Sequence, residues 1–293
     1  MSKKLAWTYL SVAFRLGKAT ISLPVALTGF LGYFLYRPQM DRNALLVASG
    51  VFLLAMGSSA INQIQERKLD AMMKRTSGRP IPAGVLSLGQ AVFLAALYTL
   101  TGIILLLLTG SPGATAIGLF VLLWYTLVYT PLKRVTAFAV FPGALVGALP
   151  PLIGWTAAGG VPWDLRIVSV AFLLFVGQMP HYWLLMLRMG EEFREAGLPS
   201  ITRVLEPRQI RNISFVWIAA TGTVVLMLPA TPLIRSRLIG LILIIASLAF
   251  LYRMFRLSYR GSLLVHWRKG FITVNLFYLM IILALIADRI IHI

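Results

Sequence analysis

The chain has 293 residues, of which 59% are hydrophobic and 12% are charged, and its mean hydropathy is +0.84. This apolar share exceeds that of soluble domains, so the composition predicts an integral membrane protein without a separate soluble domain. The sequence contains no cysteine and three histidines, which excludes disulfides, thiolate metal sites, cysteine nucleophiles and a histidine-rich metal centre.

Apolar stretches recur along the whole chain, and most are long enough for a helix to cross a bilayer. They occupy residues 19–36, 44–61, 86–108, 114–130, 137–157, 167–187, 212–229, 238–252 and 271–287. We therefore expect an all-α fold in which residues 1–293 form a single domain, a bundle of nine transmembrane helices.

The net charge of +18 predicts a membrane orientation rather than a nucleic-acid partner. If the N-terminus is cytoplasmic and the spans alternate, most basic residues face the cytoplasm, and the few that do not are Arg37, Arg42, Arg166, Arg235, Arg237 and Arg289. This positive-inside bias predicts a multi-pass protein of the inner membrane with its C-terminus outside. Most acidic residues also fall on the cytoplasmic side, where we expect the active site, and the basic face suits anionic lipid.

The segment after the second apolar stretch combines acids with bases. Asn62, Glu66 and Asp70 are four residues apart, so their oxygen-bearing side chains share one face of a helix. Such a set suits Mg²⁺, which takes oxygen ligands and is usually bound by a few carboxylates together with substrate phosphates. Cations that can bind phosphate follow closely, namely Arg67, Lys74, Arg75 and Arg79. The alternative is an ordinary helix end with salt bridges between residues four apart.

A second acidic segment follows the sixth apolar stretch. Glu191, Glu192 and Glu195 are spaced for one helical face at the same membrane surface, and Glu192 and Glu195 are candidate metal ligands beside the first cluster. A solvated acidic turn is the alternative. Just before it, His181 lies inside an apolar stretch, where an ionisable residue is either functional or hydrogen-bonded between helices.

A short basic loop follows the fourth apolar stretch, in the run from Tyr129 to Thr136. Its Lys133 and Arg134 are explained by topology alone, or they close on a diphosphate together with Tyr129.

These motifs resemble the UbiA-type intramembrane prenyltransferase superfamily. Its first motif, Asn-x-x-x-Asp-x-x-x-Asp, stands here as Asn62-x-x-x-Glu66-x-x-x-Asp70. Further similarity runs through residues 70–84, 129–136, 147–155, 180–183 and 191–199. The Pro-Pro-Leu-Ile-Gly-Trp run ending at Trp155 and the Pro-His-Tyr-Trp run ending at Trp183 resemble the members that farnesylate haem.

The resemblance implies a nine-helix bundle whose central cavity opens to the cytoplasmic side. It further implies that Asn62, Glu66, Asp70, Glu191 and Glu192 are catalytic, and that Mg²⁺ on both clusters holds farnesyl or another polyprenyl diphosphate. The acceptor would be haem B, with its vinyl group as nucleophile and His181 as the residue facing the haem. Basic side chains would bind the diphosphate.

The chain departs from that family pattern in three places. Glu66 replaces the usual aspartate, and Glu191-Glu192-Phe193 replaces an acidic pair followed by tyrosine; both changes keep the charge that binds Mg²⁺. Ser200 follows Pro199 where the haem-handling members usually continue with Met-Leu-Pro-Val, and this departure keeps a second acceptor open. The same chemistry with another lipid-soluble acceptor, such as 4-hydroxybenzoate or an isoprenoid glycerol lipid, is therefore the main alternative. A secondary transporter is disfavoured because the acids cluster at one membrane face rather than at the midplane. A purely structural subunit is disfavoured by the density of acids and bases at residues 62–79.

Overall fold

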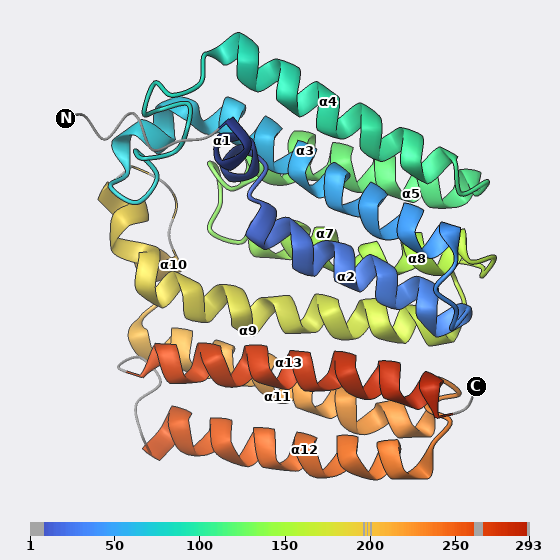
Figure 1. The fold of residues 1–293 in the computed structure, drawn as a ribbon. Helices are drawn as coiled ribbons and strands as arrows, with labels where there is room; N and C mark the ends of the chain where they lie inside the picture. The colour runs from blue at the N-terminus through green and yellow to red at the C-terminus, as the bar shows by residue number, and fades with distance from the viewer. Residues whose placement is uncertain (1–8, 196, 198, 200, 261–265, 292–293) are drawn as a thin grey trace.

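A computed structural model describes residues 9–195, 197, 199, 201–260 and 266–291, without the side chains of residues 186–195, 202 and 203. In these residues all regular structure is helical (Figure 1). The elements are α1 Tyr9–Leu16, α2 Ala19–Tyr36, α3 Arg42–Met72, α4 Leu88–Leu107, α5 Pro112–Leu123, α6 Thr130–Leu132, α7 Val140–Ala148, α8 Pro150–Ala157, α9 Leu165–Glu195, α10 Ile201–Val204, α11 Pro207–Met227, α12 Arg237–Phe255 and α13 Trp267–Ile290.

The described helices include nine candidate membrane spans, as the sequence predicts. A π-helical segment, Trp124–Tyr129, joins α5 to α6 in one span, and α7 and α8 together make another. The stretch predicted at 238–252 belongs to a longer helical span, Arg237–Arg260, which ends in a second π-helical segment. The all-α transmembrane bundle is thus confirmed.

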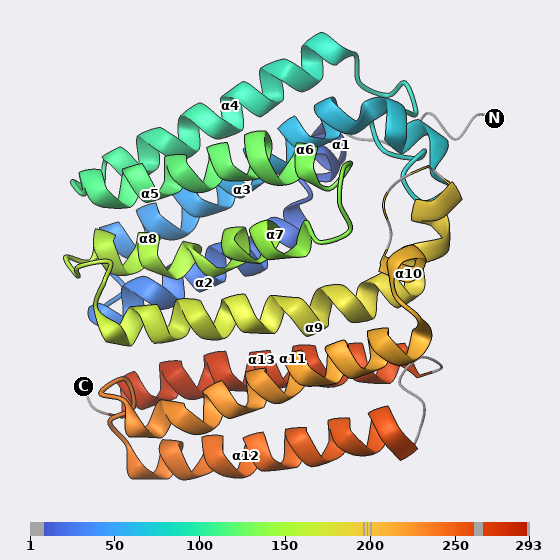
Figure 2. The ribbon, with the colours of Figure 1, turned by 180° about the vertical axis from the view of Figure 1, so that it is seen from behind.

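The bundle has two parts that meet at α9. In both views α11, α12 and α13 lie on one side of α9, and α2, α3, α4, α5, α7 and α8 lie on the other (Figures 1 and 2). One buried cluster joins α9 to α11–α13 through residues such as Leu184, Ile218 and Val274. A separate cluster joins α2, α3, α5 and α8 through residues such as Tyr33, Val51 and Ile153. Helix α9 is therefore the wall shared by both parts.

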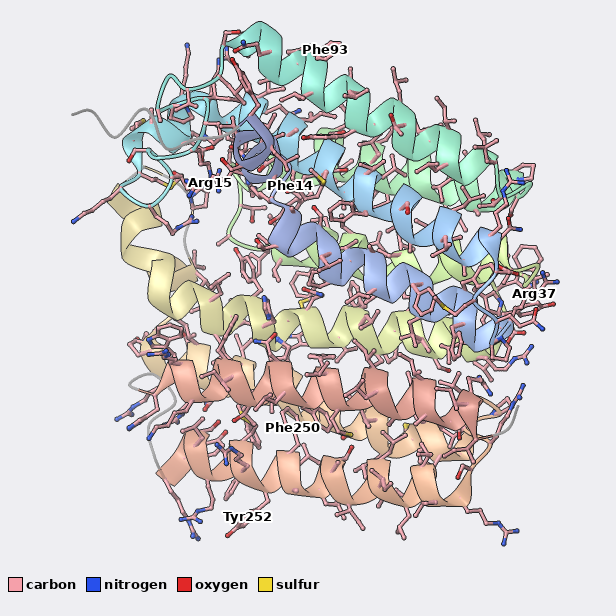
Figure 3. The ribbon with its side chains drawn as sticks, in the orientation of Figure 1. Phe14, Arg15, Arg37, Phe93, Phe250 and Tyr252 are labelled. Carbon is pink, nitrogen blue, oxygen red and sulfur yellow. The ribbon has the colours of Figure 1, made fainter. Side chains whose placement is uncertain are left out.

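Apolar side chains also cover the outside of the bundle. Phe93 on α4 and Tyr252 on α12 project outward and are mostly exposed (Figure 3). In water such a surface would be costly, but lipid tails solvate it. The polar residues of interest gather instead at one end, marked by Arg15 in Figure 3, while Arg37 lies at the opposite end.

Close packing of α2 against α8 depends on two glycines. A Cβ atom at Gly32 would collide with the backbone oxygen of Pro151, and one at Gly154 would collide with the backbone oxygen of Gly29. Because Pro151 has no N–H, the chain between α7 and α8 cannot keep an unbroken helical hydrogen-bond ladder. This contact fixes the C-terminal half of α2 against α8.

Candidate functional site

Helix α3 carries the three predicted ligands beyond the apolar stretch that begins it. Its start is capped by the Asp41 carboxylate, which accepts a hydrogen bond of 2.9 Å from the backbone N–H of Ala44. No proline or glycine interrupts residues 59–72, so the helix continues through Asn62, Glu66 and Asp70. These side chains are 1%, 6% and 1% exposed, and they share one face of the helix as the spacing predicts.

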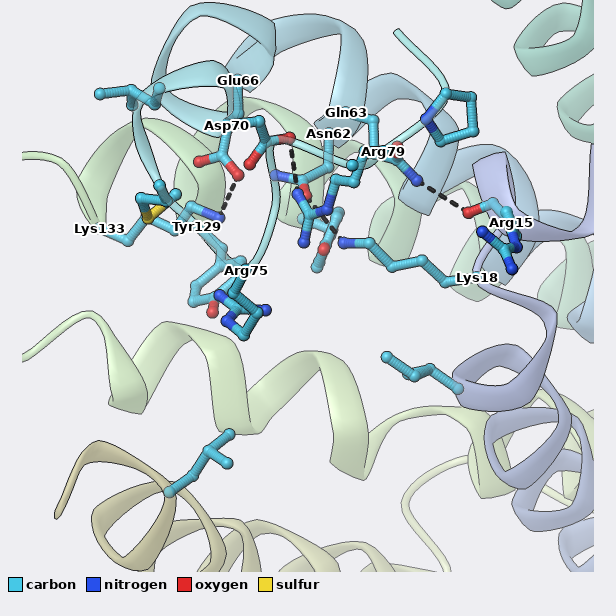
Figure 4. A pocket seen from close by; sticks show the side chains of 17 residues that line it. Arg15, Lys18, Asn62, Gln63, Glu66, Asp70, Arg75, Arg79, Tyr129 and Lys133 are labelled. Atoms are coloured by element: carbon cyan, nitrogen blue, oxygen red, sulfur yellow. Dashed lines mark hydrogen bonds and ion pairs between the residues drawn. The ribbon is translucent and has the colours of Figure 1, made fainter. Parts of the chain in front are cut away.

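Each of these three side chains contacts a cation from a different segment (Figure 4). Lys18, which lies between α1 and α2, donates from its Nζ to Asn62 Oδ1 at 3.2 Å. Lys133 Nζ lies 2.6 Å from Glu66 Oε2, and Arg79 Nη1 lies 2.6 Å from Asp70 Oδ2. Lys133 is 67 positions from Glu66, and Arg79 is 9 positions from Asp70, in the loop after α3. The alternative of salt bridges between neighbours on the same helix does not describe these pairs.

The three pairs surround a cavity of about 570 Å³ at this end of the bundle. Its walls come from the α1–α2 junction, the end of α3, the loop that follows, the π-helical segment and α9. The lining residues are Arg15, Lys18, Ile21, Asn62, Gln63, Glu66, Leu69, Asp70, Met73, Arg75, Gly78, Arg79, Pro80, Tyr125, Tyr129, Lys133 and Leu185. This lining contains more cations than carboxylates.

Burial and the neighbouring cations both disfavour the charged form of the two lysines in this cavity. Burial, helped by repulsion from Arg79 and Lys133, lowers the pKa of Lys18 to about 7. Burial also lowers the pKa of Lys133, although the adjacent Glu66 carboxylate opposes this shift. Ammonium groups whose charged form is disfavoured by burial would be stabilised by an anionic ligand. The cavity therefore favours a compact, multiply charged anion such as a diphosphate.

The donor set also fits a hard divalent cation. Asp70 Oδ1 and Gln63 Oε1 are buried oxygens without a hydrogen-bond partner, and both belong to residues that line the cavity. Unsatisfied buried acceptors are costly, so a ligand with positive charge or donor groups would stabilise them. Among the described side chains, no group of three or more histidine, cysteine, aspartate or glutamate residues could hold a metal. The candidate set here is two carboxylates and an amide, which would hold Mg²⁺ together with water and phosphate oxygens.

The structure separates the other predicted residues into two groups. Arg75 and Tyr129 line the cavity with Arg79 and Lys133. Lys74, Arg67 and Arg134 do not line it: the Arg67 guanidinium donates to the Ile64 carbonyl at 2.9 Å, and the Arg134 guanidinium donates to the Gln65 carbonyl at 2.9 Å.

The predicted residues on α9 either do not line the cavity or have side chains that the structure does not describe. The His181 ring packs against Phe271 of α13, with ring centroids 4.8 Å apart, and His181 does not line the cavity. Glu191, Glu192 and Glu195 lie on the last turns of α9, but their side chains are outside the described part of the chain. Their role as a second carboxylate cluster stays a prediction.

Sequence reasoning missed Lys18, Gln63 and Tyr125, which all line the cavity. Lys18 had a usable signal, since it is a basic residue directly before a long apolar stretch. Gln63 follows Asn62 directly, so it points to a different side of the helix and was not part of the pattern of four.

An apolar pocket of about 130 Å³ adjoins the charged cavity, because Ile21 and Tyr125 line both. Its other walls are mostly aliphatic or small and come from α2, α3, α5, α7 and α8, including Val25, Leu54 and Ile153. A charged cavity that continues into an apolar one suits a ligand with an ionic head and a hydrocarbon chain.

Comparisons with known proteins identify the family of this chain. The model of the UbiA prenyltransferase family matches residues 22–278. A curated relative from Geobacter sulfurreducens, named protoheme IX farnesyltransferase, is 43% identical over 206 residues, which are 69% of this chain and 74% of the relative. The chain belongs to the UbiA prenyltransferase family.

Solved structures share the fold at low identity. A structure of digeranylgeranylglyceryl phosphate synthase has a TM-score of 0.78 at 18% identity, and the match covers 96% of this chain and 98% of the synthase chain. A UbiA homologue from Archaeoglobus fulgidus bound to GPP and Mg²⁺ has a TM-score of 0.69 at 17% identity, with 94% and 100% covered. These likenesses establish the UbiA-type fold for this chain.

Proposed function

We propose that the protein is a protoheme IX farnesyltransferase, which transfers the farnesyl group of farnesyl diphosphate to a vinyl group of haem B and so forms haem O. The observation that supports farnesyl diphosphate as the prenyl donor is the charged cavity, which continues into an apolar pocket. In this cavity Asn62, Glu66 and Asp70 face three cations, Lys18, Arg79 and Lys133. The sequence identity to relatives named protoheme IX farnesyltransferase supports haem B as the acceptor.

The diphosphate would lie in the charged cavity. Arg79 and Lys133 are already oriented toward it by Asp70 and Glu66, and Lys18 reaches it from the opposite wall. Arg75 adds a guanidinium that can bind phosphate oxygens in a fork. The farnesyl chain would then enter the apolar pocket beyond Tyr125.

Asn62, Glu66 and Asp70 would hold Mg²⁺, and we propose that Glu192 and Glu195 complete the site from α9. When bound, Mg²⁺ neutralises the diphosphate and stabilises the negative charge that develops on it. Carboxylates at the cavity end of α3 would hold the metal, and with it the diphosphate, beside the apolar pocket. The solved relative from Archaeoglobus fulgidus was bound to GPP and Mg²⁺, which supports the choice of a prenyl diphosphate and of this metal.

The reaction begins with heterolysis of the allylic C–O bond, whose electron pair leaves with the diphosphate. Lys18, Arg79 and Lys133 stabilise that leaving group because their charges are fixed before the bond breaks. The apolar pocket shields the allylic cation from water. The π electrons of the haem vinyl group then form the new C–C bond. Water adds to the resulting carbocation and loses a proton, which leaves a hydroxyl group on the product.

The membrane orientation is part of the proposal. The cavity lies at the end of the bundle that carries most basic residues, and we propose that this end faces the cytoplasm, with the C-terminus outside. A reporter fused after Ile293 should be active only if it functions outside the cytoplasm. A reporter that requires the cytoplasm, fused at the same position, is the matched control, and its activity would contradict this orientation.

A haem titration tests whether haem B is the acceptor. Titrating haem B into the purified protein should shift the Soret band, and His181→Ala should weaken this binding while binding of farnesyl diphosphate with Mg²⁺ stays intact. Because His181 packs against α13 and not in the charged cavity, the two ligands should respond independently. Unchanged haem affinity in His181→Ala would remove that residue from the acceptor site, and no haem binding by the wild type would favour another acceptor.

A further inference from the structure

Gln63 connects the metal-ligand helix to the end of helix α1. Its side chain is 1% exposed, and its amide nitrogen donates to the Leu16 carbonyl at 2.7 Å and to the Arg15 carbonyl at 3.0 Å. The last carbonyls of a helix have no partner within the helix, and burying them without one is costly. Gln63 therefore satisfies the end of α1 from across the cavity wall, as Figure 4 shows for Arg15.

The chain turns sharply directly after this contact. Lys18, two residues beyond Leu16, has φ 48° and ψ 50°, and it is the sole non-glycine residue with positive φ in the part of the chain that the structure describes. This left-handed conformation is unfavourable for a side chain with a Cβ atom, so it persists only where surrounding contacts impose it. Gln63 supplies two such contacts, and Ser22 Oγ supplies a third by donating to the Gly17 carbonyl at 3.0 Å.

The turn determines where the Lys18 side chain points. From this backbone position its ammonium group crosses the cavity to Asn62 Oδ1, 3.2 Å away (Figure 4). An extended or helical Lys18 would direct the side chain elsewhere, because the left-handed conformation reverses the direction of the chain at this residue. The position of one cavity cation therefore depends on a hydrogen-bonded turn and not on the packing of a regular helix.

We propose that Gln63 is a positioning residue for diphosphate binding: its amide holds the α1–α2 turn in the form that delivers the Lys18 ammonium to the cavity. This inference rests on the proposed function, because it takes the diphosphate as the ligand that Lys18 contacts. Gln63 also has a buried, unpartnered Oε1 in the cavity lining, so the experiment must separate action through Lys18 from direct contact with the ligand.

A double-mutant cycle makes this separation. The probe is farnesyl S-thiolodiphosphate with Mg²⁺, an analogue that resists ionisation, and its dissociation constant is measured by calorimetry in detergent. Lys18→Met and Gln63→Met should each weaken binding about tenfold, the effect of losing one charge-assisted hydrogen bond. The dissociation constant of the double variant should not exceed that of the single variant that binds more weakly, because both substitutions remove the contact of the Lys18 ammonium with the diphosphate.

Gln65→Met is the matched control. Gln65 lies on the same helix, and its amide nitrogen donates to the Thr126 carbonyl at 3.1 Å, but it does not line the cavity. Its substitution should change the dissociation constant by less than about twofold, although it also removes a bond from a side chain to the backbone. If Gln63→Met does not fold, Gln63→Asn replaces it, since the shorter amide cannot reach both carbonyls.

Three results would overturn the inference in distinguishable ways. Wild-type affinity in the Gln63 variant would show that the turn does not depend on it. A double variant weakened about a hundredfold, the product of the single effects, would show that Gln63 acts on the ligand directly. Failure of the wild type to bind the analogue with Mg²⁺ would overturn the proposed function itself, and the positioning role with it.

Discussion

Replacing Asp70 by asparagine should reduce turnover of farnesyl diphosphate about a thousandfold, which corresponds to about 4 kcal/mol in the activation free energy. Asparagine keeps the shape of the side chain but removes the negative charge that pairs with Arg79 and that we assign to Mg²⁺. Alanine is a poorer choice, because Asp70 is almost fully buried and its removal would leave a void beside an uncompensated guanidinium.

The measurement is the initial rate of pyrophosphate release at saturating Mg²⁺ and farnesyl diphosphate, together with the unfolding temperature in detergent. Glu66→Asp is the control, because it restores the family's usual residue and keeps the charge, so its rate should stay within about tenfold of wild type. An Asp70→Asn protein that is folded and turns over at a near-normal rate would show that this carboxylate does not support ionisation.

Lys133→Met should have the second largest effect, a loss of about a hundredfold in kcat/KM for farnesyl diphosphate. The substitution removes the partner of Glu66 and one of the cations that face the leaving group, while it keeps the length of the side chain. One charge-assisted hydrogen bond accounts for part of the loss in binding, and the rest reflects weaker stabilisation of charge in the transition state. We therefore expect KM to rise and kcat to fall together.

Arg134→Met is the informative comparison for that experiment. The sequence predicts both basic residues of the loop as substrate ligands, but the Arg134 guanidinium binds the Gln65 carbonyl outside the cavity. Its substitution should lower kcat/KM by less than about threefold. Equal losses in the two variants would indicate that the loop acts through its overall charge and not through the position of Lys133.

Much of the fold was predictable because the bilayer imposes strong local constraints. Each transmembrane helix must satisfy its own backbone hydrogen bonds, so apolar length alone locates the spans. The ligand face of α3 was also predictable, because the spacing of Asn62, Glu66 and Asp70 needs only the helical repeat. The C-terminal end of α12 depends on a π-helical segment, and the break between α7 and α8 depends on Pro151, so apolar length did not define either boundary.

The partners within the site could not be derived from local rules. Lys18 contacts Asn62 across 44 positions of sequence, and Lys133 contacts Glu66 across 67. These contacts depend on how α2, α3 and the π-helical segment pack, which no spacing within one helix reveals. The position of His181 is a similar case: its place in an apolar stretch marks it as a candidate, but the sequence alone does not show that its ring packs against Phe271 of α13.

The most direct test of the central claim is the mass of the product. Purified protein is incubated with Mg²⁺, farnesyl diphosphate and equal amounts of haem B and 4-hydroxybenzoate, with a chelator in a parallel sample. We predict that haem B gains a farnesyl group and a hydroxyl group, that 4-hydroxybenzoate is unchanged, and that the chelator prevents the reaction. Prenylated 4-hydroxybenzoate with unchanged haem would contradict the haem acceptor, and equal haem product in the chelator would contradict the metal-dependent mechanism.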